Sequence, residues 1–336
     1  MANNILKYLL QDYEQSRMRA ERELEDKKEL LYNKIPRLRE IENELNSTAI
    51  KTAKNILNSN TNSLEELNNE VKKLKKEKIE ILRQNGLSES YLKAKYNCEK
   101  CKDTGYILED SKSVMCNCLK QKLLDISYNK SNISNLNKEA FENFDLDKFS
   151  DKIDFEKFNS KVSPRKNIEY IKKKCEEFVK EFDNPEGKNL LFTGNTGLGK
   201  TFMSNCIANE IIKKGKVVLY QTAPVLLDTI IKNKISKTKN EEQDEFYKNV
   251  LECDLLIIDD LGTEYLNNMI ISELFTILNT RLLNSEQKVT KTIISTNLNI
   301  EQIFRNYEER IGSRIAGFYD IYYFFGDDLR LKRKSG

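Results

Sequence analysis

Apolar residues in the first 90 positions recur every three or four residues, the spacing of one face of an amphipathic helix. The two series are Leu31, Ile35, Leu38, Ile41, Leu45 and Leu64, Leu67, Val71, Leu74. The second opens on the capping box "SLEE" at Ser63 and ends near Gly86. For residues 1–90 we predict two helices, joined by the polar stretch "NSTAIKTAKNILNSNTN" into an antiparallel hairpin. The apolar stripe either packs the two helices together or serves in part to dock another protein.

From residue 189 onward the pattern changes to short apolar runs that alternate with helical segments. The runs are "NLLFTG" (189–194), "VVLYQT" (217–222), "DLLIIDD" (254–260), "TIISTN" (292–297) and "YDIYYFF" (319–325). Strands alternating with helices form a parallel sheet covered on both faces. A helix beginning at Ser163–Pro164 precedes them, so we predict an α/β domain over residues 163–336. Residues 121–162, rich in Asn, Lys, Asp and Ser, are predicted to be a linker that docks locally.

The amino-acid composition excludes more kinds of catalytic and metal site than the net charge does. The chain is 32% charged and 39% hydrophobic, and its net charge of +3 gives no overall sign of a nucleic-acid partner. It contains no His, which excludes His-based triads, His general bases and Cys/His metal sites. No apolar run approaches the length of a membrane span, and the N-terminus is too charged for a secretory signal. We expect a cytoplasmic protein without a membrane partner.

A phosphate-binding loop is predicted where the first apolar run ends. The segment "GNTGLGKT" fits G-x-x-x-x-G-K-[ST] and consists of Gly194, Asn195, Thr196, Gly197, Leu198, Gly199, Lys200 and Thr201. Glycines let backbone amides turn toward phosphates, and the start of the following helix adds positive potential. Lys200 would reach the β- and γ-phosphates and Thr201 would bind Mg²⁺. We therefore expect ATP or ADP, with Mg²⁺, as ligands.

Two acids and an amide follow later strands. Asp259, at the end of a buried strand, can hold Mg²⁺ directly or through water. Asp260 stands where it could polarise the attacking water as a general base, although it could also merely cap the loop. If the run 292–297 lies between the first and third strands, Asn297 comes beside the γ-phosphate and orients water.

This combination resembles the additional-strand P-loop ATPases, and within them the AAA+ class, with Asn297 as the sensor on the fourth strand. The segment "ERIGSRIAGF" resembles the AAA+ box that carries an arginine finger, as in replication initiators. The resemblance implies that Arg314 acts in trans on the nucleotide of a neighbouring subunit, in an oligomer. The alternative is that Arg310 and Arg314 only pair with Glu308 or Glu309 on a solvated face.

The segment after the fifth strand, "GDDLRLKRKSG", leaves no room for the helical lid of an ordinary AAA+ protein. We expect a lidless core in which Arg330 stands in for the nucleotide-sensing Arg of the lid. With "IDDLGTE" and "ISTNL", residues 163–336 resemble the bacterial DnaC/DnaI replicative helicase loaders and the related IstB transposition helpers.

Four cysteines lie close together in "CEKCKDTGYILEDSKSVMCNC", and the motif assigns residues 91–120 to a small zinc ribbon. Cys98 and Cys101 have C-x-x-C spacing, and Cys116 and Cys118 have C-x-C spacing after a hairpin-sized insert with Gly105 at a turn. Four thiolates make a closed, structural zinc site. An iron–sulfur cluster or free thiols are the alternatives. The scattered Cys175, Cys206 and Cys253 are expected in the core.

The resemblance implies an ATP-dependent loader that binds the hexameric replicative helicase and places it on single-stranded DNA. Residues 1–90 and the ribbon would dock on the helicase. Candidates for DNA contact are Lys232, Lys234, Lys237 and the tail Arg330–Lys334. Two alternatives stay open: an IstB-like transposition or phage replication helper, and a zinc-ribbon adaptor whose nucleotide site is a switch without turnover.

Overall fold

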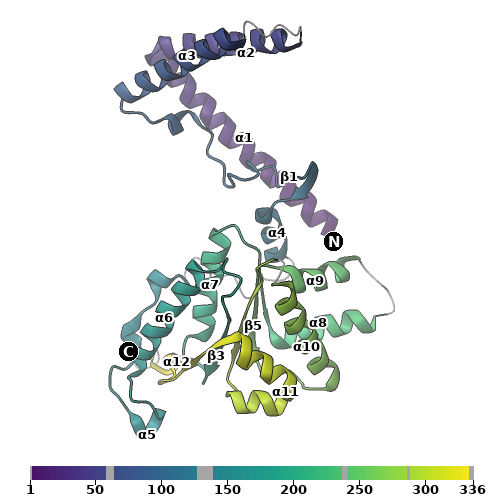
Figure 1. Cartoon of the computed structure of the whole chain (residues 1–336). Helices are drawn as coiled ribbons and strands as arrows, with labels where there is room; N and C mark the ends of the chain where they lie inside the picture. The colour runs from purple at the N-terminus through teal and green to yellow at the C-terminus, as the bar shows by residue number, and fades with distance from the viewer. Residues whose placement is uncertain (1, 58–63, 127–138, 237–240, 286–287, 333–336) are drawn as a thin grey trace. The chain divides into compact units, whose positions relative to one another are not determined.

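The structure is a computed structural model that describes residues 2–57, 64–126, 139–236, 241–285 and 288–332 (Figure 1). The chain divides into two compact units. The N-terminal unit is Leu6–Cys116, and the C-terminal unit is Asn117–Gly336 together with Met1–Ile5. Within the described residues, no helix combines the length and the apolar composition needed to cross a bilayer.

Three helices and a hairpin make up the N-terminal unit. They are α1 (Ala2–Lys34), α2 (Pro36–Leu57), α3 (Leu64–Gln84), a 3₁₀ turn (Glu89–Leu92), β1 (Tyr106–Glu109) and β2 (Lys112–Met115). The pairs Leu38 with Leu82 and Glu42 with Lys78 show that α2 and α3 are antiparallel, because one number rises as the other falls. The strands β1 and β2 pair antiparallel.

The expected two-helix hairpin is wrong in two respects. Pro36 has no N–H and starts a new helix, so that α1 and α2 are separate. The polar stretch after residue 45 is helical as far as Leu57 and does not form a loop. There the hydroxyls of Ser47 and Thr48 donate to the Glu44 carbonyl at 3.0 and 2.9 Å, and the helix absorbs these polar residues. The predicted capping box at Ser63 lies outside the described residues.

The C-terminal unit holds a five-stranded parallel sheet in the order β4-β5-β6-β3-β7. The strands are β3 (Asn189–Gly194), β4 (Val218–Thr222), β5 (Leu255–Leu261), β6 (Lys291–Thr296) and β7 (Tyr319–Phe324). The strand β6 lies between β3 and β5, which confirms the predicted insertion of the fourth core strand. The fold is therefore the α/β P-loop arrangement of the AAA+ class, as predicted.

Helices cover both faces of this sheet (Figure 1). The helices of this unit are α4 (Asn117–Leu124), α5 (Phe155–Phe158), α6 (Pro164–Lys180), α7 (Lys200–Lys213), α8 (Ala223–Ile235), α9 (Glu241–Glu252), α10 (Asn268–Asn284), α11 (Ile300–Phe318) and α12 (Leu329–Lys332), of which the short α5 does not cover the sheet. The helices α6 and α7 share one apolar cluster with the sheet, and α8 to α11 share the other. The alternation of apolar strands and helices in the sequence thus becomes a three-layer core.

The segment predicted as a linker contributes to this core. Two 3₁₀ turns (Phe141–Asn143 and Leu146–Lys148) precede α5. Phe141 and Phe149 are buried in the same cluster as α6 and α7. Their burial fixes residues 141–149 against the start of α7, which follows the phosphate loop directly.

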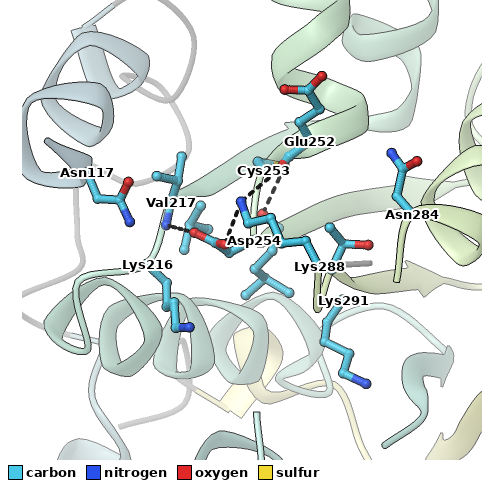
Figure 2. A network of polar contacts seen from close by, with 12 residues as sticks. Asn117, Lys216, Val217, Glu252, Cys253, Asp254, Asn284, Lys288 and Lys291 are labelled. Carbon is cyan, nitrogen blue, oxygen red and sulfur yellow. Dashed lines mark hydrogen bonds and ion pairs between the residues drawn. The ribbon is translucent and has the colours of Figure 1, made fainter. Parts of the chain in front are cut away.

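Asp254 holds the amino-terminal ends of three strands in register (Figure 2). Its side chain accepts a hydrogen bond from the Val217 N–H at 2.7 Å and pairs with Lys288 at 2.9 Å. Its backbone carbonyl accepts from the Lys291 N–H at 2.8 Å. Since β4, β5 and β6 all begin here, these contacts fix which residues face each other at the opposite end of the sheet.

Candidate nucleotide site

The predicted phosphate loop connects β3 to α7, with Gly194 ending the strand and Lys200 opening the helix. Gly197 has φ +72°, and a Cβ atom there would collide with the carboxylate of Asp328. The Leu329 N–H donates to the Gly197 carbonyl at 3.1 Å. The phosphate loop is thus in direct contact with the start of α12, and a side chain at residue 197 would disrupt that contact.

Lys200 lies inside the hollow of its own loop. The side chain is 6% exposed. Its ammonium donates to the carbonyls of Gly194 and Asn195 at 2.6 and 2.7 Å and to Asn297 Oδ1 at 2.8 Å. Asn297 follows β6 directly, so the inserted strand brings the predicted sensor amide to the predicted phosphate-binding lysine.

Burial lowers the pKa of Lys200 to about 8, since it disfavours the charged ammonium. Asp260 and Asp259 oppose this shift, and the positive charge of Arg330 adds to it. Arg330 therefore acts electrostatically on the same cleft, although its own side chain is exposed.

Asp259 ends its strand inside a ring of hydroxyl groups. Thr201 Oγ1 and Tyr220 OH donate to Asp259 Oδ2 at 3.1 and 2.5 Å. Ser295 Oγ donates to the other carboxylate oxygen. Three donors thus fix the orientation of the carboxylate. Thr201 and Asp259, the two predicted Mg²⁺ ligands, are thus in contact, and their oxygens are the donor type that Mg²⁺ takes.

Asp260 has φ +55°, a left-handed conformation that is uncommon for a residue other than Gly. Its N–H donates to Asp259 Oδ1 at 3.1 Å and to Ser295 Oγ at 3.2 Å, which holds the strained backbone. The side chain faces the cleft. Burial first, and then the charge of Asp259, raise the pKa of its carboxyl, while Lys200 and Arg330 lower it.

Lys200, Thr201, Asp260, Asn297 and Arg330 line one cleft of about 580 Å³. The cleft also has a second wall that sequence reasoning missed, formed by the supposed linker: Glu139, Asn143, Phe144, Asp145, Lys148 and Phe149. The ring of Phe144 stacks on Phe149 with centroids 5.7 Å apart and meets Phe202 of α7 edge-on at 5.4 Å. Beside a polar phosphate loop, this apolar wall would suit the base of a nucleotide. Isolated aromatics in a polar stretch were the only signal.

Arg314 does not line the cleft. Its guanidinium donates to Asn279 Oδ1 at 2.9 and 2.7 Å and lies 4.3 Å from the ring centre of Phe275. Arg310 lies 4.5 Å from the same ring and pairs with Glu308 at 2.9 Å. The ion pair considered above is thus present for Arg310, and Arg314 is held by α10.

The lysines considered for DNA contact are engaged in ion pairs. Lys232 pairs with Asp228 and Lys234 with Glu273, both at 2.5 Å. Lys237 and the residues after Lys332 lie outside the described residues, and Arg330 belongs to the cleft.

The four clustered cysteines converge in space. The sulfur atoms of Cys98, Cys101, Cys116 and Cys118 all lie within 4.8 Å of one another, and none forms a disulfide. Cys98 and Cys116 sulfurs are 3.9 Å apart. Zinc–sulfur bonds of about 2.3 Å in a tetrahedron place sulfurs about 3.8 Å apart. The donor set and its spacing therefore fit a four-thiolate zinc ion. The cysteines expected in the core, Cys175, Cys206 and Cys253, are buried.

Comparisons with known proteins point to one family. Residues 153–318, a little under half of the chain, match the bacterial DnaA ATPase domain. The chromosomal replication initiator protein DnaA of Campylobacter jejuni is 33% identical over 127 residues, which are 38% of this chain and 27% of that protein. The chain thus aligns with about a quarter of the length of this curated relative. The family match is thus to a DnaA ATPase domain, and the strand order of the core is that of an AAA+ nucleotide-binding fold.

Two solved structures are similar at a lower level. The DnaC helicase loader has 22% identity and a TM-score of 0.43, covering 55% of this chain and 98% of that chain. DnaI has 24% identity and a TM-score of 0.43, covering 58% and 92%. At identities below 25% and TM-scores below 0.5, the assignment of the fold depends on the strand order alone.

Proposed function

We propose that this protein binds and hydrolyses ATP and uses that cycle to load the hexameric replicative helicase onto single-stranded DNA. One observation carries the ATPase part. A single cleft brings together polar side chains from four separate segments, and these are Lys200, Thr201, Asp260, Asn297 and Arg330. Asp259 lies directly behind them, in contact with Thr201.

Lys200 would exchange its carbonyl acceptors for phosphate oxygens. Its ammonium donates to the backbone carbonyls of Gly194 and Asn195, and a neutral carbonyl is a weaker acceptor than a charged phosphate. Thr201 and Asp259 would hold Mg²⁺, which when bound neutralises phosphate charge. The hydroxyls of Tyr220 and Ser295 hold the Asp259 carboxylate in its orientation.

Asp260 would accept the proton of the attacking water, and Asn297 would orient that water. A raised pKa suits a general base, because it brings the proton affinity of the carboxylate closer to the working pH. Asp260 combines a left-handed backbone with a side chain that lines the cleft.

Arg314 would act on the nucleotide of a neighbouring copy. It lies outside the cleft of its own chain, so that it could stabilise transferred charge only in the cleft of another subunit. Phe275 and Asn279 support the guanidinium on α10, so that it is held before any assembly.

Two functions in replication initiation are compatible with such a core. The DnaA match favours an origin-binding initiator. The N-terminal helices and the four cysteines lie outside that match, and they agree better with the DnaC/DnaI-type sequence features of the core. We therefore favour the loader, with the N-terminal unit docking on the helicase and the core contacting DNA.

The test mixes the full-length protein with the replicative helicase of its own organism, with and without ATP, and reads the masses of intact complexes. Lys200→Ala is the control. A nucleotide-dependent complex of defined stoichiometry supports the loader. Specific binding to duplex origin DNA without any helicase complex would instead establish the initiator.

A further inference from the structure

We propose that Glu264 and Tyr307 are positioning residues that connect the nucleotide cleft to the half of α11 that carries Arg310 and Arg314. This inference rests on the proposed function in two respects: the nucleotide is ATP, and Arg314 acts on the cleft of a neighbouring subunit. It adds a route by which the state of one cleft reaches the arginines offered to the next subunit.

The connection is a buried bridge between a loop and a helix. Tyr307 is 0% exposed, and its hydroxyl donates to Glu264 Oε1. The other oxygen of Glu264 accepts from the Gly262 N–H at 2.9 Å. Each oxygen of the carboxylate thus serves one donor, and Glu264 itself is 9% exposed.

One end of the bridge belongs to the cleft. Glu264 is in the loop that follows β5, and Thr263 of that loop lines the cleft with Asp260. The Thr263 hydroxyl donates to the Asp260 carbonyl at 2.8 Å. Gly262 is packed so closely that a Cβ atom there would lie 2.8 Å from Leu298. A change at Asp260 therefore displaces Glu264 through a tightly packed turn.

The other end of the bridge is a break in α11. Tyr307 (φ −117°) and Glu308 (φ +65°, ψ 158°) are not helical, so the nineteen residues of α11 form two helical halves. The Glu308 conformation is strained for a side chain other than Gly. The Tyr307–Glu264 hydrogen bond lies at this break and holds its geometry.

The second half of α11 carries both arginines. A Cβ atom on Gly312 would lie 2.6 Å from the Phe304 ring, so the two halves are in close contact. Arg310 and Arg314 both lie over Phe275 of α10. The helix α10 begins at Asn268, directly after the loop of Glu264. The two helices that hold the arginines, α10 and α11, therefore both contact or adjoin that loop.

When Asp260 and Thr263 contact nucleotide and water, the loop would shift and Glu264 would carry the shift to Tyr307. The break at Glu308 allows the second half of α11 to reorient without unfolding. The orientation of Arg314 then depends on the occupancy of its own cleft.

Three variants of the full-length protein test this bridge. Tyr307→Phe removes one hydroxyl. Glu264→Gln keeps the shape of the side chain but replaces the charged acceptor with a neutral amide, which weakens the bond to Tyr307. In the double variant the Gln oxygen can still accept from the Gly262 N–H. Tyr319→Phe is the matched control, because it removes another buried tyrosine hydroxyl, one that bonds Thr292 at the far end of the sheet.

The readouts are the kcat and KM of ATP hydrolysis by the assembled protein and hydrogen exchange of residues 308–318 with and without ATP. We expect each single variant to lower kcat about tenfold at unchanged KM, and the double variant to be no worse, since the two residues act as one bridge. ATP should change exchange in 308–318 in the wild type and in Tyr319→Phe, and in neither bridge variant.

A wild-type kcat and a wild-type exchange response in Tyr307→Phe and Glu264→Gln would overturn the inference while leaving the proposed ATPase intact. Losses that multiply in the double variant, or that Tyr319→Phe shares, would show a general structural effect and overturn it as well. A wild-type protein that does not bind ATP would refute the proposed function, and the bridge with it.

Discussion

Lys200 makes nucleotide affinity depend on pH in a direction that the structure fixes. Burial lowers its pKa to about 8, so the ammonium is mostly charged at pH 7 and mostly neutral at pH 9. Only the charged form attracts phosphate. A pH one unit above the pKa leaves roughly one tenth of the protein charged, so ATP should bind about tenfold more weakly at pH 9 than at pH 7.

The assay is isothermal titration of ATP into the nucleotide-free protein at half-unit steps from pH 7.5 to 9.5. Bound phosphates favour the ammonium, so binding at pH 9 should take up close to one proton, seen by comparing buffers of different ionisation heat. In Lys200→Arg the guanidinium stays charged, and affinity, although weaker, should not change with pH.

The pH dependence of folding stability is an independent test of the lowered pKa of Lys200. An unfolded lysine has a pKa near 10.4, so from about pH 8 to pH 10 the unfolded chain holds this proton more strongly than the free folded protein. Nucleotide-free protein should therefore gain stability over the window in which ATP affinity falls. Constant ATP affinity from pH 7.5 to 9.5, without proton uptake, would refute the reasoning.

Three further predictions concern the sheet and the cysteines. Asp254→Ala leaves the buried Val217 N–H without its acceptor and should lower the free energy of unfolding by about 1–3 kcal/mol. The measurement is a lower melting temperature at unchanged ATP affinity. Lys288→Ala removes only the exposed partner of Asp254 and should lower the free energy of unfolding by less than about 1 kcal/mol. Cys116→Ser should reduce bound zinc well below one ion per chain by elemental analysis. Asp103→Asn should weaken zinc about tenfold or more in a chelator competition, because Asp103 accepts from the Cys98 N–H at 2.8 Å.

Each of these has its own contradicting result. Equal losses for Asp254→Ala and Lys288→Ala would mean that the ion pair, and not the backbone contact, holds the strand. Full zinc content in Cys116→Ser would remove that thiolate from the ligand set. For Asp103→Asn, the exposed Glu109→Gln in the same unit is the matched loss of charge, and equal effects would refute a specific contact.

Local sequence patterns predicted the sheet because each strand carries its own signal. The run 292–297 ends in polar residues, which suits a strand inserted between the first and third strands, and β6 does lie between β3 and β5. The meeting of Lys200 with Asn297 follows from that order. The positions of both side chains depend on short segments whose geometry is nearly fixed by strand, loop and helix.

Contacts between distant segments could not be predicted in the same way. Tyr307 and Glu264 are 43 positions apart, and nothing in "FRNYEER" indicates that α11 breaks at Glu308. Arg281 is 2% exposed and satisfied by the carbonyls of Val250 and Lys291, although a charged residue is expected outside. Such placements are decided by what the rest of the chain packs against them.

The contact between Gly197 and Asp328 has a consequence for how sequences of this kind can diverge. No side chain fits at residue 197 while the carboxylate of Asp328 occupies that space, and the Leu329 N–H depends on the same turn. A substitution at either position changes what the other can be. In an alignment of relatives, positions 197 and 328 should therefore vary as a pair, and the first helix after β7 should be retained or lost together with this form of the phosphate loop.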